Sequence, residues 1–173
     1  MQGLCLTQYS GGGYSARLGY TGRPEGTSNA MAAKDLSFDD IKVGDRAEMM
    51  WTPVAADIVA FAALSGDHNP LHTDRAYAES HGFPDCVVHG FLAGAKVSAL
   101  IGMLLPGRRC LLLESQLSHP NPVFAGDFVV LRGKVRERWP DLRLIELSIK
   151  GIKTQDGKDK AVIQGKVICK ILY

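Results

Sequence analysis

An acid and an imidazole lie close together in the segment Gly66–His72. The acid is Asp67, the imidazole is His72, and Pro70 lies between them. Because proline cannot continue a helix and disfavours helical geometry in the residue before it, we expect this segment to form a stiff, bent loop. At neutral pH an ordinary aspartate is ionised and an ordinary histidine is largely neutral, so both side chains can accept a proton from one shared water. The spacing indicates general acid–base chemistry.

A glycine at the start of a long apolar stretch offers a second reactive group. His89 and Gly90 precede Phe91–Leu105, an almost uninterrupted apolar run that we expect to form a helix. The first N–H groups of a helix have no partner inside the helix and lie at the positive end of its dipole. Gly90 has no side chain, so a developing negative charge can approach its N–H closely. His89 is expected to orient the turn before Gly90.

Two predicted helices position the acid and the imidazole. The first begins with a Thr-Pro cap at residues 52–53 and ends at Gly66, which places Asp67 at its C-terminal exit. The second is a short helix over residues 74–80, with Thr73 as its N-cap. Both helices are therefore expected to fix the ends of the reactive segment.

The second half of the chain has the alternating pattern of β-strands, and a Asp-Gly pair marks a hairpin turn at residues 156–157. A helix that is apolar on nearly every side must be surrounded, and the small residues within 91–105 let other elements pack closely against it. The sequence therefore predicts an α+β domain whose antiparallel sheet wraps around one central apolar helix. Five segments are predicted to be strands: 45–51, 111–118, 128–138, 142–154 and 160–172.

Composition indicates one globular domain preceded by a tail. The chain has 173 residues, enough for one domain with a real core. Residues 1–30 are rich in Gly, Ser and Tyr and show no period, so we expect a flexible N-terminal tail and a domain over 31–173. The net charge is +2 and no basic stripe with interleaved aromatics occurs, so a nucleic-acid partner is not expected. No apolar run is long enough for a membrane span.

The spacing of the cysteines indicates the cellular compartment in which the protein is expected. The four, at positions 5, 86, 110 and 169, form no Cys-x-x-Cys pair, and we interpret them as free thiols, although three disulfide pairings are open in principle. Cys86 has apolar neighbours and is expected to be a small buried residue rather than a nucleophile. A cytoplasmic location follows. An organelle matrix is the alternative, because Arg17 and Arg23 precede the first acid, but the tail lacks an amphipathic apolar face.

The histidines of this region do not have the spacing of a helical zinc site. Pro70 prevents His68 and His72 from lying one turn apart on the same helix face. We therefore expect no metal.

Three segments resemble one known family. Residues 61–72, with the sequence FAALSGDHNPLH, are followed by Val88-His89-Gly90 and later by PVFAGD at residues 122–127. Together they resemble MaoC-like domains and, more narrowly, the (R)-specific enoyl-CoA hydratases and type 2 3-hydroxyacyl-thioester dehydratases. The resemblance extends from about residue 38 to the C-terminus.

The resemblance implies a hot-dog fold and the reversible addition of water to a trans-2-enoyl thioester, giving an (R)-3-hydroxyacyl thioester. It assigns Asp67 and His72 as the catalytic pair and places Gly90 where it can bind the thioester oxygen. Asn69 is expected to brace the loop, and His89 to support the site. The CoA or acyl-carrier phosphopantetheine belongs to the substrate, so no separate cofactor is expected. The family likeness also implies a homodimer formed by joining sheets.

Several functional points stay open at the level of sequence. Ser98 and Ile101 lie on the same predicted helix as Gly90 and are candidates for an acyl pocket. An acyl-CoA thioesterase on the same fold and a non-catalytic acyl-thioester-binding module are the alternative functions. The acyl chain length, the choice between CoA and a carrier protein, and the physiological direction are not determined.

Overall fold

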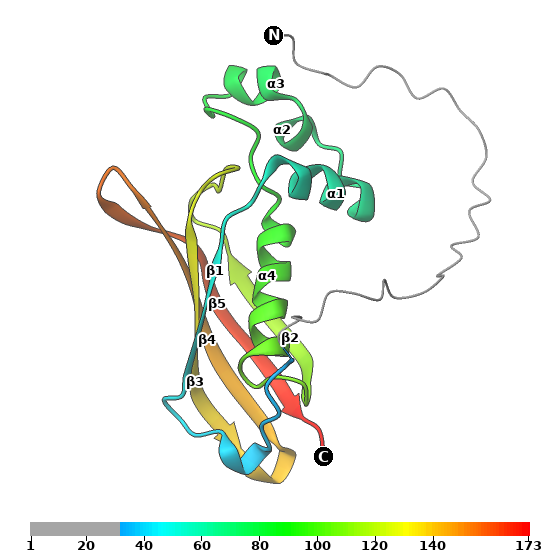
Figure 1. Ribbon diagram of the computed structural model, residues 1–173, viewed down its shortest axis with the longest axis vertical. Helices are drawn as coiled ribbons and strands as arrows, with labels where there is room; N and C mark the ends of the chain where they lie inside the picture. The colour runs from blue at the N-terminus through cyan, green and yellow to red at the C-terminus, as the bar shows by residue number, and fades with distance from the viewer. Residues whose placement is uncertain (1–31) are drawn as a thin grey trace, which may run out of the picture. The chain divides into compact units, whose positions relative to one another are not determined.

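The computed structural model describes residues 32–173 (Figure 1). The predicted tail and the first residue of the predicted domain lie outside this range. The helices are α1 (Ala55–Ser65), α2 (Pro70–Thr73), α3 (Arg75–Ser80) and α4 (Gly90–Met103), and short 3-10 turns occupy Phe38–Asp40 and Pro140–Leu142. The strands are β1 (Arg46–Trp51), β2 (Cys110–Ser118), β3 (Val129–Trp139), β4 (Leu144–Gln155) and β5 (Lys158–Ile171).

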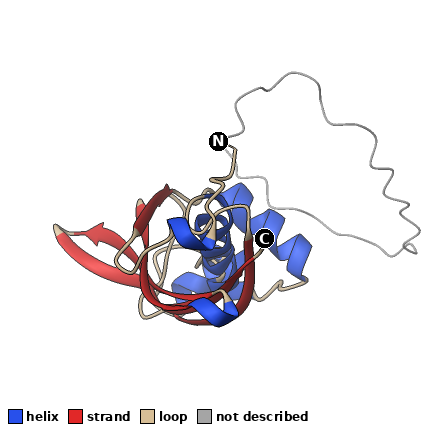
Figure 2. Cartoon of the chain, turned by 90° about the horizontal axis from the view of Figure 1, so that it is seen from below, coloured by secondary structure: helices blue, strands red, loops and turns tan. Residues whose placement is uncertain are grey.

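The five strands form one antiparallel sheet in the order β1-β3-β4-β5-β2. Seen along its length, the sheet curves around α4 (Figure 2). The β4–β5 hairpin turns at Asp156 and Gly157, which have positive φ values of 53° and 70°. A two-residue hairpin of this kind favours Asp-Gly, because its backbone matches the twist of the strands. The predicted α+β hot-dog fold and its hairpin are confirmed.

The core lies between α4 and the concave face of the sheet. Val97, Leu100 and Ile101 of α4 are fully buried, as are Leu131 of β3 and Leu147 of β4. Strand β3 alternates as expected, with buried residues facing α4 and charged residues facing outward.

Gly133 on β3 allows α4 to pack closely against the sheet. A Cβ atom at this position would lie 2.9 Å from Leu100 Cδ2, closer than side chains approach one another in folded proteins. Packing against the end of the Leu100 side chain, rather than backbone conformation, therefore favours glycine here.

The expectation that the central helix is surrounded is wrong for the described chain. One face of α4 packs on the sheet, whereas Phe91, Ala95 and Ser98 on another face are exposed, and the side chain of Phe91 is 87% exposed. These residues lie three and four positions apart, so they form one stripe. The sheet of a single chain covers only the face of the helix that it contacts.

Two helix caps also differ from the predicted ones. Helix α1 begins after Val54, whose N–H donates to the carboxylate of Asp57 (3.0 Å), and not at the Thr-Pro pair. Helix α3 is capped by Asp74, which accepts from the N–H of Tyr77 (3.1 Å), rather than by Thr73. In both cases a carboxylate satisfies a free N–H group of the first turn. Within residues 32–173, no helix is long and apolar enough to cross a bilayer.

Candidate active site

The end of α1 places Asp67. Gly66 ends the helix in the left-handed region (φ 77°), and the N–H of Asp67 donates to the Ser65 hydroxyl (3.2 Å). Asp67 Oδ1 in turn accepts the N–H of Asn69 (3.2 Å). One carboxylate oxygen therefore braces the backbone, and the other, Oδ2, is left to face His72.

Residues 70–73 form a helical turn, so the prediction of a bent loop is wrong for this part of the segment. Pro70 is the first residue of α2, where its missing N–H has no helical partner to lose. The side chain of Asn69 caps the turn by accepting the N–H of Leu71 (2.9 Å). The turn carries His72 back toward Asp67.

A backbone carbonyl determines the tautomer of His72. The ring Nδ1 lies 2.6 Å from the carbonyl oxygen of Val87, and because a carbonyl can only accept, Nδ1 carries the hydrogen. In the neutral ring Nε2 is then a free acceptor, and it lies 3.9 Å from Asp67 Oδ2. This separation is too long for a direct hydrogen bond and suits one water that contacts both atoms. The pair is thus arranged to hold and deprotonate a water.

His89 lies beneath this pair. Its ring is 1% exposed, stacks on the ring of His72 with centroids 3.9 Å apart, and donates from Nε2 to the backbone carbonyl of Asp67 (3.0 Å). Phe61 packs on it with a centroid distance of 5.1 Å. The position of His89 thus depends on the same segment that carries the acid.

Asp67, His72 and His89 each offer one potential ligand atom, and these atoms lie within 4.8 Å of one another. Two stacked rings, however, direct their in-plane lone pairs side by side rather than toward one ion, and Nε2 of His89 already donates to a carbonyl. The geometry suits an acid–base pair better than a metal centre. The expected absence of a metal stays a prediction.

A hollow of about 280 Å³, called here the site hollow, opens beside His72 and Gly90. Gly90 is the first residue of α4, so its N–H has no partner within the helix. The other walls are mostly apolar and include Leu71, Phe83, Val88 and Val123. The site hollow therefore joins a base, a free N–H group and space for an apolar chain.

The two residues expected in an acyl pocket lie elsewhere. Ile101 is 2% exposed within the core, and Ser98 belongs to the exposed stripe of α4. Neither lines the site hollow. Their role in acyl binding stays a prediction.

His119 was not singled out from the sequence, although it lines the site hollow together with His72. It follows the last residue of β2, and no spacing along the chain relates it to Asp67. Its position directly after a predicted strand was the only signal in the sequence.

Cys86, which was expected to be buried, is only half-buried, and it is a poor candidate for a nucleophile. Cys86, Cys110 and Cys169 are free, as predicted, whereas Cys5 lies outside the described range. Burial raises the pKa of the Cys86 thiol, and so does the nearby carboxylate of Asp85. The thiol of Cys86 is therefore less available as a thiolate at neutral pH.

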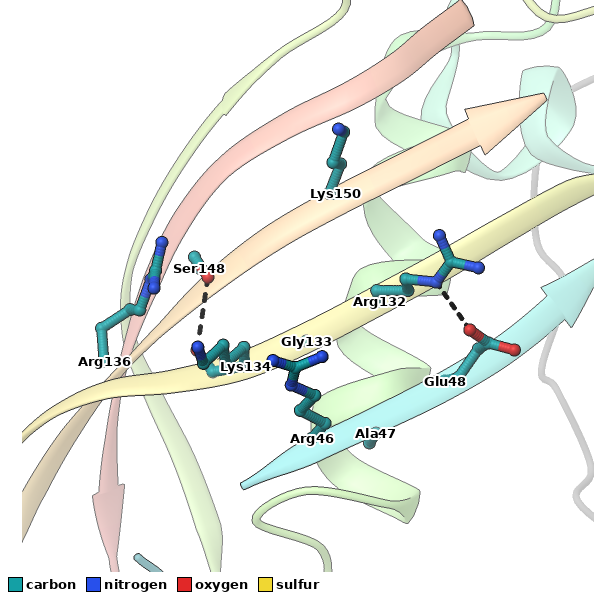
Figure 3. Close-up of a pocket in the computed structure, with 9 residues that line it drawn as sticks. All are labelled: Arg46, Ala47, Glu48, Arg132, Gly133, Lys134, Arg136, Ser148 and Lys150. Atoms are coloured by element: carbon teal, nitrogen blue, oxygen red, sulfur yellow. Dashed lines mark hydrogen bonds and ion pairs between the residues drawn. The ribbon is translucent and has the colours of Figure 1, made fainter. Parts of the chain in front are cut away.

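A larger hollow of about 430 Å³, called here the outer hollow, lies on β1, β3 and β4, on the sheet face turned away from α4 (Figure 3). Its single carboxylate, that of Glu48, pairs with Arg132 (2.6 Å). Register places Arg46 opposite Lys134, and Arg132 opposite Lys150. The outer hollow is thus strongly basic but contains no acid–imidazole pair.

The chain is similar to proteins of one known family. Residues 32–154 match the family model of MaoC-like domains. The chain is 36% identical to the (R)-specific enoyl-CoA hydratase of Aeromonas caviae over 79% of this chain and 99% of that protein. It is 35% identical to the enzyme of the same name from Rhodospirillum rubrum, over 66% of this chain and 82% of that protein. The solved R-hydratase of Pseudomonas aeruginosa superimposes with a TM-score of 0.72 at 32% identity, covering 79% and 85% of the two chains.

Proposed function

The chain belongs to the MaoC-like domain family, and from that premise we propose that it catalyses the reversible addition of water to trans-2-enoyl-CoA thioesters to give (R)-3-hydroxyacyl thioesters. The observation that carries the proposal is the 3.9 Å separation between Asp67 Oδ2 and His72 Nε2, together with the position of His72 in the wall of the site hollow. An enzyme that catalyses this reaction is a hydro-lyase.

The first step is the attack of water on C3 of the enoyl group. The water oxygen forms the new C–O bond while one of its protons passes to the Asp67–His72 pair, and the π electrons move toward the thioester oxygen. The pair then returns one proton to C2 as the enolate collapses, so the atoms of one water are added in total. General acid–base groups of this kind typically contribute on the order of 100- to 10,000-fold in rate.

The backbone N–H of Gly90 stabilises the enolate oxygen. It lies at the N-terminus of α4, where a free donor and the helix dipole both favour negative charge. The missing side chain lets the thioester carbonyl come close. Gly90 and His72 both line the site hollow, and Asp67 lies next to His72 without lining it, so one bound thioester can reach the N–H group and the imidazole.

A second copy of the chain covers the open face of α4. Strand β2 ends the sheet with an unpaired edge, and three consecutive leucines on it, Leu111–Leu113, are 41–54% exposed. Phe91 and Ala95, at the start of the exposed stripe of α4, are apolar as well. Joining two β2 edges buries both features and forms a symmetric homodimer. Light scattering should give twice the mass of one chain, and a monomeric mass contradicts this part of the proposal.

One assay separates hydration from the alternative functions. With crotonyl-CoA as substrate, the ultraviolet absorbance of the conjugated enoyl thioester should fall while a thiol reagent detects no free CoA. Release of free thiol instead identifies a thioesterase, and binding without either change identifies a non-catalytic module. Chiral chromatography of the product should give the (R) isomer.

Several finer points of the proposal rest on the sequence alone. These are the absence of a cofactor beyond the carrier arm of the substrate and the cytoplasmic location; the choice between CoA and an acyl carrier protein stays open. Comparing crotonyl-CoA with a crotonyl carrier protein in the same assay tests which carrier the enzyme uses.

A further inference from the structure

The ring of His119 lies directly against the first residue of α4. A Cβ atom built on Gly90 would be 3.3 Å from His119 Cδ2 and 3.4 Å from His119 Nε2. Both residues line the site hollow, and so does His72. A thioester carbonyl that reaches the N–H of Gly90 therefore passes along the edge of the His119 imidazole.

The loop that carries His119 is tied to the segment that leads into Gly90. Asn121 donates from Nδ2 to the carbonyl of Ala161 on β5 (2.8 Å), and Pro120 and Pro122 stiffen the chain on both sides of it. The N–H of Val88 donates to the carbonyl of Val123 (2.8 Å). These contacts hold the backbone of the loop in place relative to the start of α4.

A second connection lies farther along the same loop, where Val87 and Phe124 form an antiparallel bridge. Asp127 accepts the N–H of Phe124 (2.8 Å) and pairs with Lys153 of β4 (2.7 Å), a lysine that is 3% exposed. The loop is thus anchored to the sheet as well as to the segment before α4.

The ring nitrogens of His119 are free to contact a ligand. Among residues 32–173, no hydrogen bond or ion pair involves this ring, in contrast to His72 and His89, which each bind a backbone carbonyl. An imidazole carries at least one N–H in either protonation state. His119 is exposed at the rim of the site hollow, and the wall beside it is mostly apolar, so its ring N–H is within reach of a thioester bound there.

We propose that His119 is a second hydrogen-bond donor to the thioester oxygen, acting beside the N–H of Gly90. The inference rests on the proposed hydration. An enolate oxygen accepts more than one hydrogen bond, and removal of one donor from such a site typically lowers kcat on the order of 100- to 1,000-fold. His119 keeps its proton throughout the reaction, and proton transfer stays with Asp67 and His72.

The test compares variants that keep or remove the N–H group. His119→Phe keeps a ring of similar size without a donor, whereas His119→Gln keeps an amide N–H at a similar reach. We expect kcat with crotonyl-CoA to fall on the order of 100- to 1,000-fold in His119→Phe, with little change in KM, and to be largely retained in His119→Gln. His81→Phe, at the exposed residue that follows helix α3, is the matched control and should keep full activity.

A spectrum of bound ligand separates hydrogen bonding from a merely structural role. Polarisation of the carbonyl should shift the absorbance of bound 2,4-hexadienoyl-CoA to longer wavelength in the natural protein and in His119→Gln, and less so in His119→Phe. Full kcat and a full shift in His119→Phe overturn the inference. His119→Leu is a second donor-free variant, so a folding defect in one variant does not decide the outcome.

The two possible failures are distinguishable. If the natural protein does not hydrate crotonyl-CoA, the proposed function fails. If it does and the donor-free variants match its kcat, only the role of His119 fails.

Discussion

The two hollows of this domain differ in what their charges can do. The outer hollow is the larger and holds five cationic side chains, which repel one another across neighbouring strands. Within residues 32–173, Arg132 alone of the five has an acidic partner. The site hollow is smaller and mostly apolar, yet at its edge a carbonyl determines which nitrogen of His72 is free. Neither volume nor charge distinguishes a site of reaction. The site of reaction is distinguished by a base with a determined tautomer that lies beside a free helix N–H group.

Of the substitutions that test this comparison, we expect the largest effect at Asp67. Asp67→Asn keeps an oxygen that can accept the N–H of Asn69, so the turn is retained, but the amide cannot share the proton of water. We expect kcat for hydration of crotonyl-CoA to fall on the order of 100- to 10,000-fold. The control is Asp156→Asn in the β4–β5 turn, where φ is 53° and asparagine is well tolerated. Equal activity of the two variants would exclude Asp67 from the reaction.

Gly90→Ala tests whether the site hollow needs an unobstructed helix start. The N–H remains, but the new methyl group would lie 3.3 Å from His119 and hold the thioester away. A displacement of about 1 Å costs on the order of 100-fold in rate, so we expect a fall of that size in kcat/KM. Gly94→Ala on the same helix is the control, because its Cβ would meet Leu117 at an ordinary 3.8 Å. A similar loss in both variants would point to a general helix defect.

Gly133 lines the outer hollow but faces α4, so its replacement should affect stability rather than catalysis. Gly133→Ala places a methyl group against Leu100, and overpacking of this kind costs about 1–3 kcal/mol in the free energy of unfolding. Denaturant unfolding measures the loss. The kcat of the folded fraction should be unchanged, and a large fall in kcat would link the outer hollow to the reaction.

The smallest expected effect is at the charges of the outer hollow. Lys134→Thr removes a cation that lies opposite Arg46 and places a β-branched residue in an antiparallel strand. Relief of like-charge repulsion should increase the free energy of unfolding by about 0.2–1 kcal/mol at low salt, and less at high salt. Urea midpoints at two salt concentrations measure this, while hydration of crotonyl-CoA should not change.

Much of the fold was predictable because its signals are local. The Asp-Gly turn, the alternation of β3 and the end of α1 at Gly66 each follow from the backbone preferences of a few neighbouring residues. Pro70 was the exception. The same residue that breaks a helix from inside can begin one, and whether α2 forms depends on the Asn69 cap and on what His72 contacts.

The sequence by itself determined that Asp67 and His72 lie close together and that Gly90 begins an apolar helix, since only neighbouring residues are involved. Tertiary structure decided which nitrogen of His72 is free, because the carbonyl of Val87 comes from another segment. It also decided that His119 lies against Gly90, because the position of β2 in the sheet and the anchored loop after it depend on contacts between distant parts of the chain.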